Sequence, residues 1–335
     1  NLNYININLK KNLLTSGSKY YVKSFLDYEK KEPSDITEIH NRPNYLTQIS
    51  EAKIKSKIVL YFHNDPLTMN GSKTTKDRNF LLNFASTIIF NSQWSKRRFL
   101  EEMPSSSINS DKLFVIYQSA DKPMIKFNRK KKWITFVGKL NSAKGYDLYG
   151  KAILKILLKH KDWHGIVIGD EPRQKLLFKH KRLKKLGFLN HKKVLNIYSR
   201  TSIAVACSRW NEPLGRTSLE ASSRGCATII SNKGGLPETV THGIILKDLN
   251  VDSVYAAIKN LIENKKERLL IQKLSLKNFF HTNIISSRNI DDYREKLLNI
   301  PAKVNKSNIF IPKSIRILHV TNFNERHDGR LFFNT

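Results

Sequence analysis

Short apolar runs recur along the chain, and turn residues or stretches of helical periodicity separate them. Runs of this length and bounding are typical of buried parallel strands. Strands that alternate with helices predict a doubly wound parallel α/β sheet. The predicted strands are residues 4–9, 35–40, 58–62, 87–90, 113–117, 133–137, 165–168, 187–189, 203–206, 227–230 and 314–320, and helical patterns include 19–31, 195–200 and 251–264.

Composition sets the class of protein. The 335 residues suffice for two ordinary domains, and 40% hydrophobic with 10% aromatic residues fits a globular chain. No apolar run approaches the roughly 18 residues that a membrane span needs, and no signal peptide pattern is present. Cys207 and Cys226 fit small buried residues of a reduced protein. We therefore expect a cytoplasmic protein, with peripheral attachment to the inner face of the cell membrane as an option.

The net charge of +31 is unusual. Excess lysine is compatible with nucleic acid binding, with an anionic membrane surface, or with the composition of the source genome. The lysine-rich stretches lack the regularly interleaved aromatics of a single-strand binder. We interpret the charge as solvated surface with a patch that faces anionic membrane, and we expect no specific nucleic acid partner.

The most informative stretch follows the predicted strand 203–206. Gly215 lies in a turn, and Thr217 with Glu220 three residues later predicts a capping box at the start of a helix. Backbone N–H groups in such a loop and the helix dipole favour an anion such as a diphosphate. Glu212 precedes Glu220 with seven residues between them, so both carboxylates can face one crevice. For Glu220 the alternative is a plain capping residue.

A second loop of this kind follows the predicted strand 133–137 and runs from Gly138 to Gly145. Lys139 and Lys144 in this loop can converge on a diphosphate and stabilise charge that builds on a leaving group. Lysine offers a point charge without the bidentate fork of arginine. The alternative is that both are ordinary surface lysines of a lysine-rich chain.

His63 comes directly after the predicted strand 58–62. In an open α/β sheet, ligands bind outside the carboxyl ends of the strands, so His63 is a candidate for the site. His40 also follows a strand and is a weaker candidate. The alternative for His63 is a histidine in a turn.

These motifs resemble those of retaining, nucleotide-sugar-dependent glycosyltransferases of family 4. Glu212 and Glu220 match the E-x7-E signature, in the context of Pro213, Gly215 and the downstream residues 234–238. Residues 138–145 resemble the family's G-R-L-x-x-x-K-G loop, with Lys139 in place of arginine. The resemblance implies the GT-B fold, two Rossmann-like domains facing a central cleft.

The resemblance also implies roles for these residues. It makes Glu212 a ligand of donor sugar hydroxyls, Glu220 a ligand of the ribose, and His63 a neighbour of the transferred sugar. It implies a metal-independent hexosyltransferase without a cofactor, which uses a UDP- or GDP-linked donor and a glycan or lipid-linked acceptor in cell envelope polysaccharide biosynthesis. The candidate catalytic residues are His63, Lys139, Lys144 and Glu212, and the candidate donor-binding residues are Gly138, Lys139, Lys144, Gly215, Arg216, Thr217 and Glu220.

The element order predicts how the chain divides. The expected parts are an N-terminal Rossmann-like acceptor domain at 1–128, without its first strand and glycine loop, a nucleotide-sugar-binding domain at 129–285, a helix at 286–300 that crosses back to the first domain, a linker at 301–313, and the start of a second glycosyltransferase unit at 314–335. For residues 314–335, a strand of the same domain and a loose tail are the alternatives.

Two other functions remain open at this point. One keeps the fold and runs the chemistry as a sugar phosphorylase or synthase. The other is a non-catalytic basic protein that binds anionic membrane or nucleic acid, because a fold alone does not decide function. In that case, binding would survive loss of Glu212 and Glu220 and would fall steeply with salt.

Overall fold

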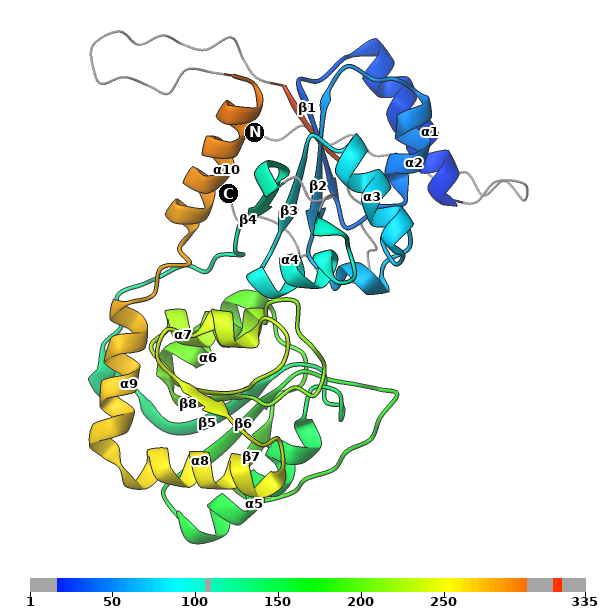
Figure 1. The fold of residues 1–335 in the computed structure, drawn as a ribbon. Coiled ribbons are helices and arrows are strands. Elements are labelled where there is room, and N and C mark those ends of the chain that lie inside the picture. Colours follow the sequence, from blue (N-terminus) through cyan, green and yellow to red (C-terminus); the bar gives the residue numbers. More distant parts are fainter. Residues whose placement is uncertain (1–16, 106–109, 300–315, 321–335) are drawn as a thin grey trace, which may run out of the picture. The chain divides into compact units, whose positions relative to one another are not determined.

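The computed structural model describes residues 17–105, 110–299 and 316–320 (Figure 1). The chain divides into two compact units. Among the described residues, unit 1 comprises residues 17–105, 110–116, 289–299 and 316–320, and unit 2 comprises residues 117–288. Each unit is an α/β unit built on a parallel sheet, as the alternation of strands and helices predicts.

The division between the units falls before the predicted boundary at residue 128. The segment that follows Ile116 is bound to unit 2 by hydrogen bonds. The Tyr117 hydroxyl donates to Glu238 Oε2 over 2.9 Å, and the backbone N–H of Ala120 donates to the carbonyl of His281 over 3.0 Å. On the other side, the chain joins unit 1 again at residue 289, within the helix predicted to return there.

Unit 1 holds a five-stranded sheet in the order β11-β1-β2-β3-β4, with every pair of neighbours parallel. The strands are β1 (Ile36–His40), β2 (Lys57–Phe62), β3 (Thr87–Phe90), β4 (Leu113–Val115) and β11 (Ile317–Val320), and the helices are α1 (Gly17–Lys31), α2 (Tyr45–Glu51), α3 (Thr75–Phe84), α4 (Gln93–Leu100) and the C-terminal part of α10 (Asn283–Leu297).

Alternation along the strands explains why helices cover both faces of this sheet. Ile39 and Leu60 point to one face and pack with residues of α1, α2 and α3. Ile36 and Val59 point to the other face and pack with Tyr293 of α10. Polar residues at even positions of β1 therefore also lie on the α10 face, which matters for Glu38 and His40.

The strand near the C-terminal end of the chain lies at the edge of this sheet. β11 pairs in parallel with β1, with Ile317 opposite Ile36 and Val320 opposite Ile39. Val320 is buried in the same core as Ile39. Residues 317–320 are therefore a strand of unit 1 in the structure, which corrects the expectation that they open a separate unit. The predicted strand at 4–9, the linker at 301–313 and residues 321–335 lie outside the described residues.

Unit 2 holds a six-stranded parallel sheet in the order β10-β9-β8-β5-β6-β7. The strands are β5 (Lys131–Val137), β6 (His164–Ile168), β7 (Leu183–Lys185), β8 (Thr201–Ala206), β9 (Ala227–Ser231) and β10 (Ile244–Leu246), and the helices are α5 (Tyr146–Lys159), α6 (His191–Arg200), α7 (Arg216–Ser223), α8 (Val251–Glu263) and α9 (Lys265–Lys277).

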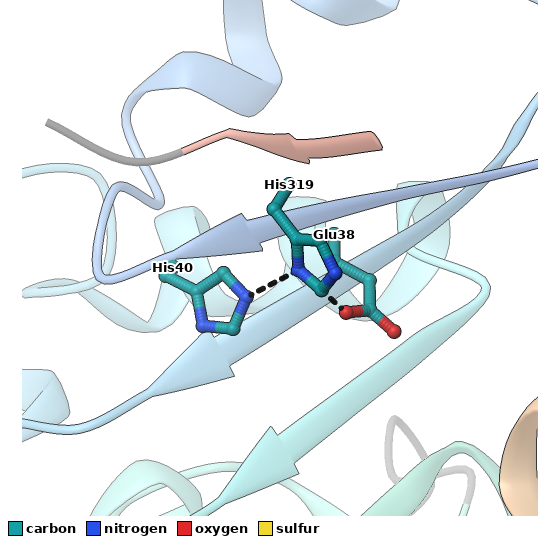
Figure 2. A group of neighbouring side chains, drawn as sticks. All are labelled: Glu38, His40 and His319. Carbon is teal, nitrogen blue, oxygen red and sulfur yellow. Dashed lines mark hydrogen bonds and ion pairs between the residues drawn. The ribbon is translucent and has the colours of Figure 1, made fainter. Parts of the chain in front are cut away.

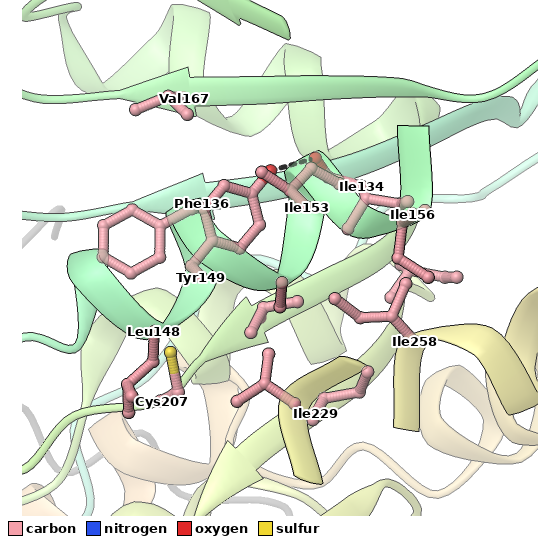
Figure 3. Close-up of a cluster of buried hydrophobic side chains, with 14 of the residues drawn as sticks. Ile134, Phe136, Leu148, Tyr149, Ile153, Ile156, Val167, Cys207, Ile229 and Ile258 are labelled. Atoms are coloured by element: carbon pink, nitrogen blue, oxygen red, sulfur yellow. Dashed lines mark hydrogen bonds between the residues drawn. The ribbon is translucent and has the colours of Figure 1, made fainter. Parts of the chain in front are cut away.

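The larger core of unit 2 lies between its sheet and helices α5 and α8 (Figure 3). Ile134 and Phe136 of β5 point into it, and the Tyr149 hydroxyl of α5 donates to the Ile134 carbonyl over 2.7 Å. That bond satisfies a polar group that burial would otherwise leave without a partner. Trp133 and Val137 point to the opposite face and pack in the cluster that includes residues of α6. The core thus holds the carboxyl end of β5 rigidly beside that of β8.

Two local predictions in unit 2 are wrong. The predicted strand 133–137 begins earlier, because Lys131 already pairs with Thr201 of β8. The predicted short strand at 187–189 lies earlier, at Leu183–Lys185, because Gly187 turns the chain at φ +67°. Within the described ranges, no helix combines the length and apolarity needed to cross a bilayer.

Candidate functional site

Two loops meet at the carboxyl edge of the unit 2 sheet. Residues 138–145 follow β5 and residues 207–215 follow β8, and these strands are neighbours in a parallel sheet. The backbone N–H of Arg209 and the Ser208 hydroxyl both donate to the carbonyl of Ala143, over 2.9 and 3.1 Å. The contact is close because Gly145, at φ +73°, has no side chain; a Cβ there would lie 1.8 Å from the Cys207 carbonyl oxygen.

The meeting of these loops pairs two of the predicted catalytic residues. Lys144 Nζ lies 2.5 Å from Glu212 Oε1, and their side chains are 32% and 15% exposed. Asn141 holds the Lys144 end of the loop, because its Oδ1 accepts the Lys144 backbone N–H over 3.0 Å. Lys139 is exposed and forms no ion pair within the described part of the chain. The structure thus brings Lys144 to Glu212 and leaves Lys139 at the surface.

Glu212 is held from the other side by the loop after β9. Gly235 donates its backbone N–H to the Glu212 carbonyl over 2.6 Å, and Glu212 forms an isolated parallel bridge with Gly234. Gly234 has φ +62°, and a Cβ there would lie 2.2 Å from the Glu212 carbonyl oxygen. Gly234 and Gly235 are therefore required because a side chain at either position would prevent the backbones of the two loops from touching.

We expect Gly234→Ala to destabilise unit 2 and to displace Glu212. Gly187→Ala is the matched control, because Gly187 has a similar φ of +67° and nothing lies within 4 Å of its ideal Cβ. Gly187→Ala should lower the free energy of unfolding by about 1 kcal/mol, because alanine disfavours the left-handed backbone conformation. Gly234→Ala adds the steric clash and should lower it by about 2–4 kcal/mol. Urea unfolding measures both variants, and equal losses would contradict the clash.

Helix α7 begins two residues earlier than a capping box at Thr217 requires. Its N-cap is Gly215 at φ +105°, which provides no side-chain cap, and Thr217 lies in the first turn. A Cβ at position 215 would lie 2.5 Å from Leu236 Cδ2, so packing selects glycine as the cap. The capping-box prediction is therefore wrong. The helix starts without a side-chain hydrogen bond, which suits the binding of an anion at this end.

Glu220 is buried on α7 and has two basic neighbours. Its Oε1 lies 3.0 Å from His191 Nε2 and accepts a hydrogen bond from Arg216 Nη2 over 3.1 Å. Its Oε2 makes no hydrogen bond within the described residues and is not among the buried polar atoms without a partner, so it can accept from a ligand. His191 was missed in the sequence. The signal available was the Asn190 cap that starts α6 with His191 as its first residue.

His63 belongs to unit 1, whereas the other predicted site residues belong to unit 2. It follows β2, and its backbone N–H donates to Asn41 Oδ1 over 2.9 Å. The Asn91 side chain donates to its carbonyl over 3.0 Å. Burial lowers the pKa of His63 to about 4, so the imidazole is neutral at pH 7. His63 Nε2 lies 3.0 Å from His40 Nδ1, which makes His40 part of the same arrangement.

A cavity of about 490 Å³ lies elsewhere in unit 2. It is lined by Lys131 and Trp133 at the beginning of β5, by His164 at the beginning of β6, and by Lys184. It therefore lies at the amino-terminal edge of the sheet, away from the loops that hold Lys144 and Glu212, and we do not assign it to the site.

The chain is similar to known proteins over much of its length. The chain is 26% identical to the putative glycosyltransferase YtcC of Bacillus subtilis over 256 residues, which cover 66% of this chain and 62% of YtcC. It is 23% identical to spore coat protein SA of the same species, over 73% of this chain and 74% of that protein. The chain thus spans less than two thirds of YtcC.

Solved structures show the same fold. The crystal structure of Anabaena HepE in complex with UDP-glucose matches with a TM-score of 0.65 at 17% identity, over 82% of each chain. A glycosyltransferase from Rickettsia africae matches with a TM-score of 0.67 at 18% identity, over 89% of this chain and 85% of that one. These two neighbours and the two parallel sheets establish the GT-B fold.

The family model described as glycosyl transferases group 1 matches residues 118–274. That match contains both loops of the candidate site, from Gly138 to Glu238, and lies within unit 2. Residues 118–274 are therefore similar to a group 1 glycosyltransferase domain, in a chain with the GT-B fold.

Proposed function

We propose that this chain is a retaining glycosyltransferase that moves a sugar from a nucleoside-diphosphate sugar to a glycan or lipid-linked acceptor. The observation that carries the proposal is the meeting of Lys144 with Glu212 beside the uncapped start of α7. A cation, a carboxylate and a helix N-terminus at one edge of the sheet suit the two ends of such a donor, the diphosphate and the sugar hydroxyls.

Each residue has a distinct task in this proposal. In the transfer, the bond between the sugar C1 and the diphosphate oxygen breaks, a bond forms from C1 to the acceptor oxygen, and the proton of the acceptor hydroxyl passes to the departing diphosphate. Negative charge builds on the departing diphosphate, where Lys144, Lys139 and the α7 amides would stabilise it. Glu212 would accept hydrogen bonds from sugar hydroxyls, and Glu220 Oε2 would accept one from the ribose.

The donor is proposed to be UDP-linked. HepE, which shares the fold, was solved in complexes with UDP-glucose and with UDP. The proposal requires no metal ion, because two lysines and a helix start can neutralise a diphosphate. We also propose that the acceptor belongs to cell envelope biosynthesis and that the strong positive charge keeps the protein at an anionic inner membrane surface.

Thermal unfolding with UDP, GDP, ADP and CMP tests the donor site. UDP at 100 times its dissociation constant should stabilise the wild type by about 2.7 kcal/mol, which raises its melting temperature by several degrees. Glu220→Ala should abolish that increase if Oε2 binds the ribose. EDTA should not change the result if no metal is needed.

The matched control is Glu267→Ala, because Glu267 is a partly exposed carboxylate in the first turn of α9, in the same unit. It should keep the nucleotide response. If none of the nucleotides stabilises the wild type, or if Glu220→Ala keeps the full response, the assignment of the donor site is wrong.

A further inference from the structure

Three histidines and one glutamate form a continuous chain of contacts in unit 1. Glu38 and His40 lie on β1, His63 follows β2, and His319 lies on β11. His319 Nδ1 is 3.0 Å from Glu38 Oε2 and 3.4 Å from His40 Nε2 (Figure 2). On its other side, His40 Nδ1 is 3.0 Å from His63 Nε2. The angle between the planes of these two rings is 3°. The chain therefore runs from Glu38 to His63.

Glu38 at one end is ionised. It is 1% exposed, yet Arg294 of α10 donates to both of its oxygens, over 2.8 and 2.9 Å, and Tyr293 donates to Oε1. Hydrogen bonds from His319 and Arg294 lower the pKa of Glu38 to about 2 although burial opposes them. A carboxylate fixed in this way can only accept hydrogen bonds.

An ionised Glu38 fixes the proton of His319. With Nδ1 of His319 only 3.0 Å from the carboxylate, that nitrogen must carry the hydrogen, because two lone pairs at this distance would repel. The same nitrogen faces His40 Nε2. His40 Nε2 therefore lies opposite an N–H and must be the lone-pair nitrogen of its ring.

The argument continues to His63. Burial lowers the pKa of His40 well below its usual value, so the ring is neutral and carries one hydrogen. With Nε2 unprotonated, that hydrogen is on Nδ1 and is donated to His63 Nε2. His63 is also neutral, so its own hydrogen is on Nδ1. That Nδ1 is buried and has no hydrogen-bond partner within the described residues.

A metal ion is the other occupant that this chemistry allows. One ligand atom each from Glu38, His40 and His319 lie within 4.8 Å of one another, the only such group among the described residues. The guanidinium of Arg294 already neutralises Glu38, however, so a divalent cation would add two uncompensated charges to a buried site. The proton on His319 accounts for these contacts without that cost.

We propose that Glu38, acting through His319 and His40, fixes His63 as the neutral tautomer with its hydrogen on Nδ1. His63 is then a hydrogen-bond donor and not a general base. An unpaired buried N–H destabilises the fold, and an acceptor oxygen of a ligand would remove that penalty. Glu38, His40 and His319 are positioning residues.

Nitrogen-15 NMR of the full chain labelled at histidine reads the tautomer directly, without any ligand. His63→Gln assigns the His63 signals. We expect Nδ1 of His63 to be the proton-bearing nitrogen in the wild type. Glu38→Gln replaces a carboxylate, which can only accept hydrogen bonds, by an amide that can also donate. His319 Nδ1 then no longer has to carry the hydrogen, so His63 should also populate the tautomer with its hydrogen on Nε2.

Two variants of His319 keep the test sharp if Glu38→Gln does not fold. His319→Asn retains an N–H near the position of Nδ1 and should keep the wild-type tautomer, whereas His319→Ala should mix the two. Glu101→Gln is the control, since Glu101 pairs with Arg98 at the surface of the same unit. A wild-type His63 with its hydrogen on Nε2 would overturn the proposal. Stoichiometric zinc binding that His319→Ala abolishes would also overturn it.

Nucleotide stabilisation and the histidine tautomer are separate measurements. If no nucleotide stabilises the protein but His63 carries its hydrogen on Nδ1, the donor site is refuted and the proposal for the histidines stands. If a nucleotide stabilises the protein but His63 carries its hydrogen on Nε2, only the proposal for the histidines is refuted.

Discussion

Lys144→Ala should lower transferase turnover by about two to three orders of magnitude, the usual loss when a group that stabilises transition-state charge is removed. Lys144 lies 2.5 Å from Glu212, so its removal also leaves that carboxylate without its cation. A Glu212 that repels the diphosphate would add to the loss. Steady-state kinetics with the donor that stabilises the protein against heat measures the effect.

A double-mutant cycle separates the two contributions. If the pair acts as a unit, Lys144→Ala combined with Glu212→Gln should be far less than additive in its free energy of activation. Lys151→Ala is the control, because Lys151 is an exposed lysine on the adjacent helix α5 and should leave turnover unchanged. Full turnover in Lys144→Ala would show that the diphosphate is not bound by this loop.

Arg294→Leu should destabilise unit 1 by about 3–5 kcal/mol, because it leaves the buried Glu38 without its cation. The wild type should in turn be sensitive to acid. The pKa of Glu38 is about 2 in the folded chain against its usual value of 4.5, so the stabilisation is complete above pH 4.5 and is lost as the pH falls towards 2. The size of that loss is about 3 kcal/mol.

Hydrogen exchange of the β1 and β2 amides at several pH values reports on unit 1 separately from unit 2. Arg316→Leu is the matched control, since Arg316 and Glu32 form an ion pair at the surface of the same unit, with side chains 41% and 55% exposed. Its loss should change stability far less, because exposed ion pairs contribute little. A similar cost for both arginines would mean that the Glu38 pair is weaker than its burial indicates.

Most strands of both sheets were predictable from sequence, because buried parallel strands are short apolar runs that end at polar turns, but β7 was misplaced and β10 was not predicted. β3 occupies the predicted residues 87–90, and β1, β2, β6 and β8 start or end within two residues of the prediction. The start of β5 was predicted two residues too late, because Lys131 and Lys132 are charged and strand residues outside the core need not be apolar. The start of α7 was misjudged, since packing against Leu236 selects Gly215 as the cap.

The candidate site could be predicted in part. The loops that hold Lys144 and Glu212 were recognised in the sequence, but their ion pair depends on β5 and β8 being neighbours in the sheet, which no local pattern gives. His191 could not be assigned as a partner of Glu220, because no sequence pattern gives the orientation of α6. His319 was beyond prediction as a partner of Glu38 and His40, since a pairing between strands at opposite ends of the chain leaves no local signal.

The pairing of β11 with β1 has a consequence for synthesis on the ribosome. Unit 2 is almost contiguous in sequence, whereas the edge strand of unit 1 follows it in the chain. Contacts between such distant segments form slowly, and domains generally fold as they emerge. We therefore expect unit 2 to become protease-resistant first. The nascent β1 would then keep an exposed edge for the time it takes to translate the intervening residues, and during that time it would be the segment most in need of a chaperone.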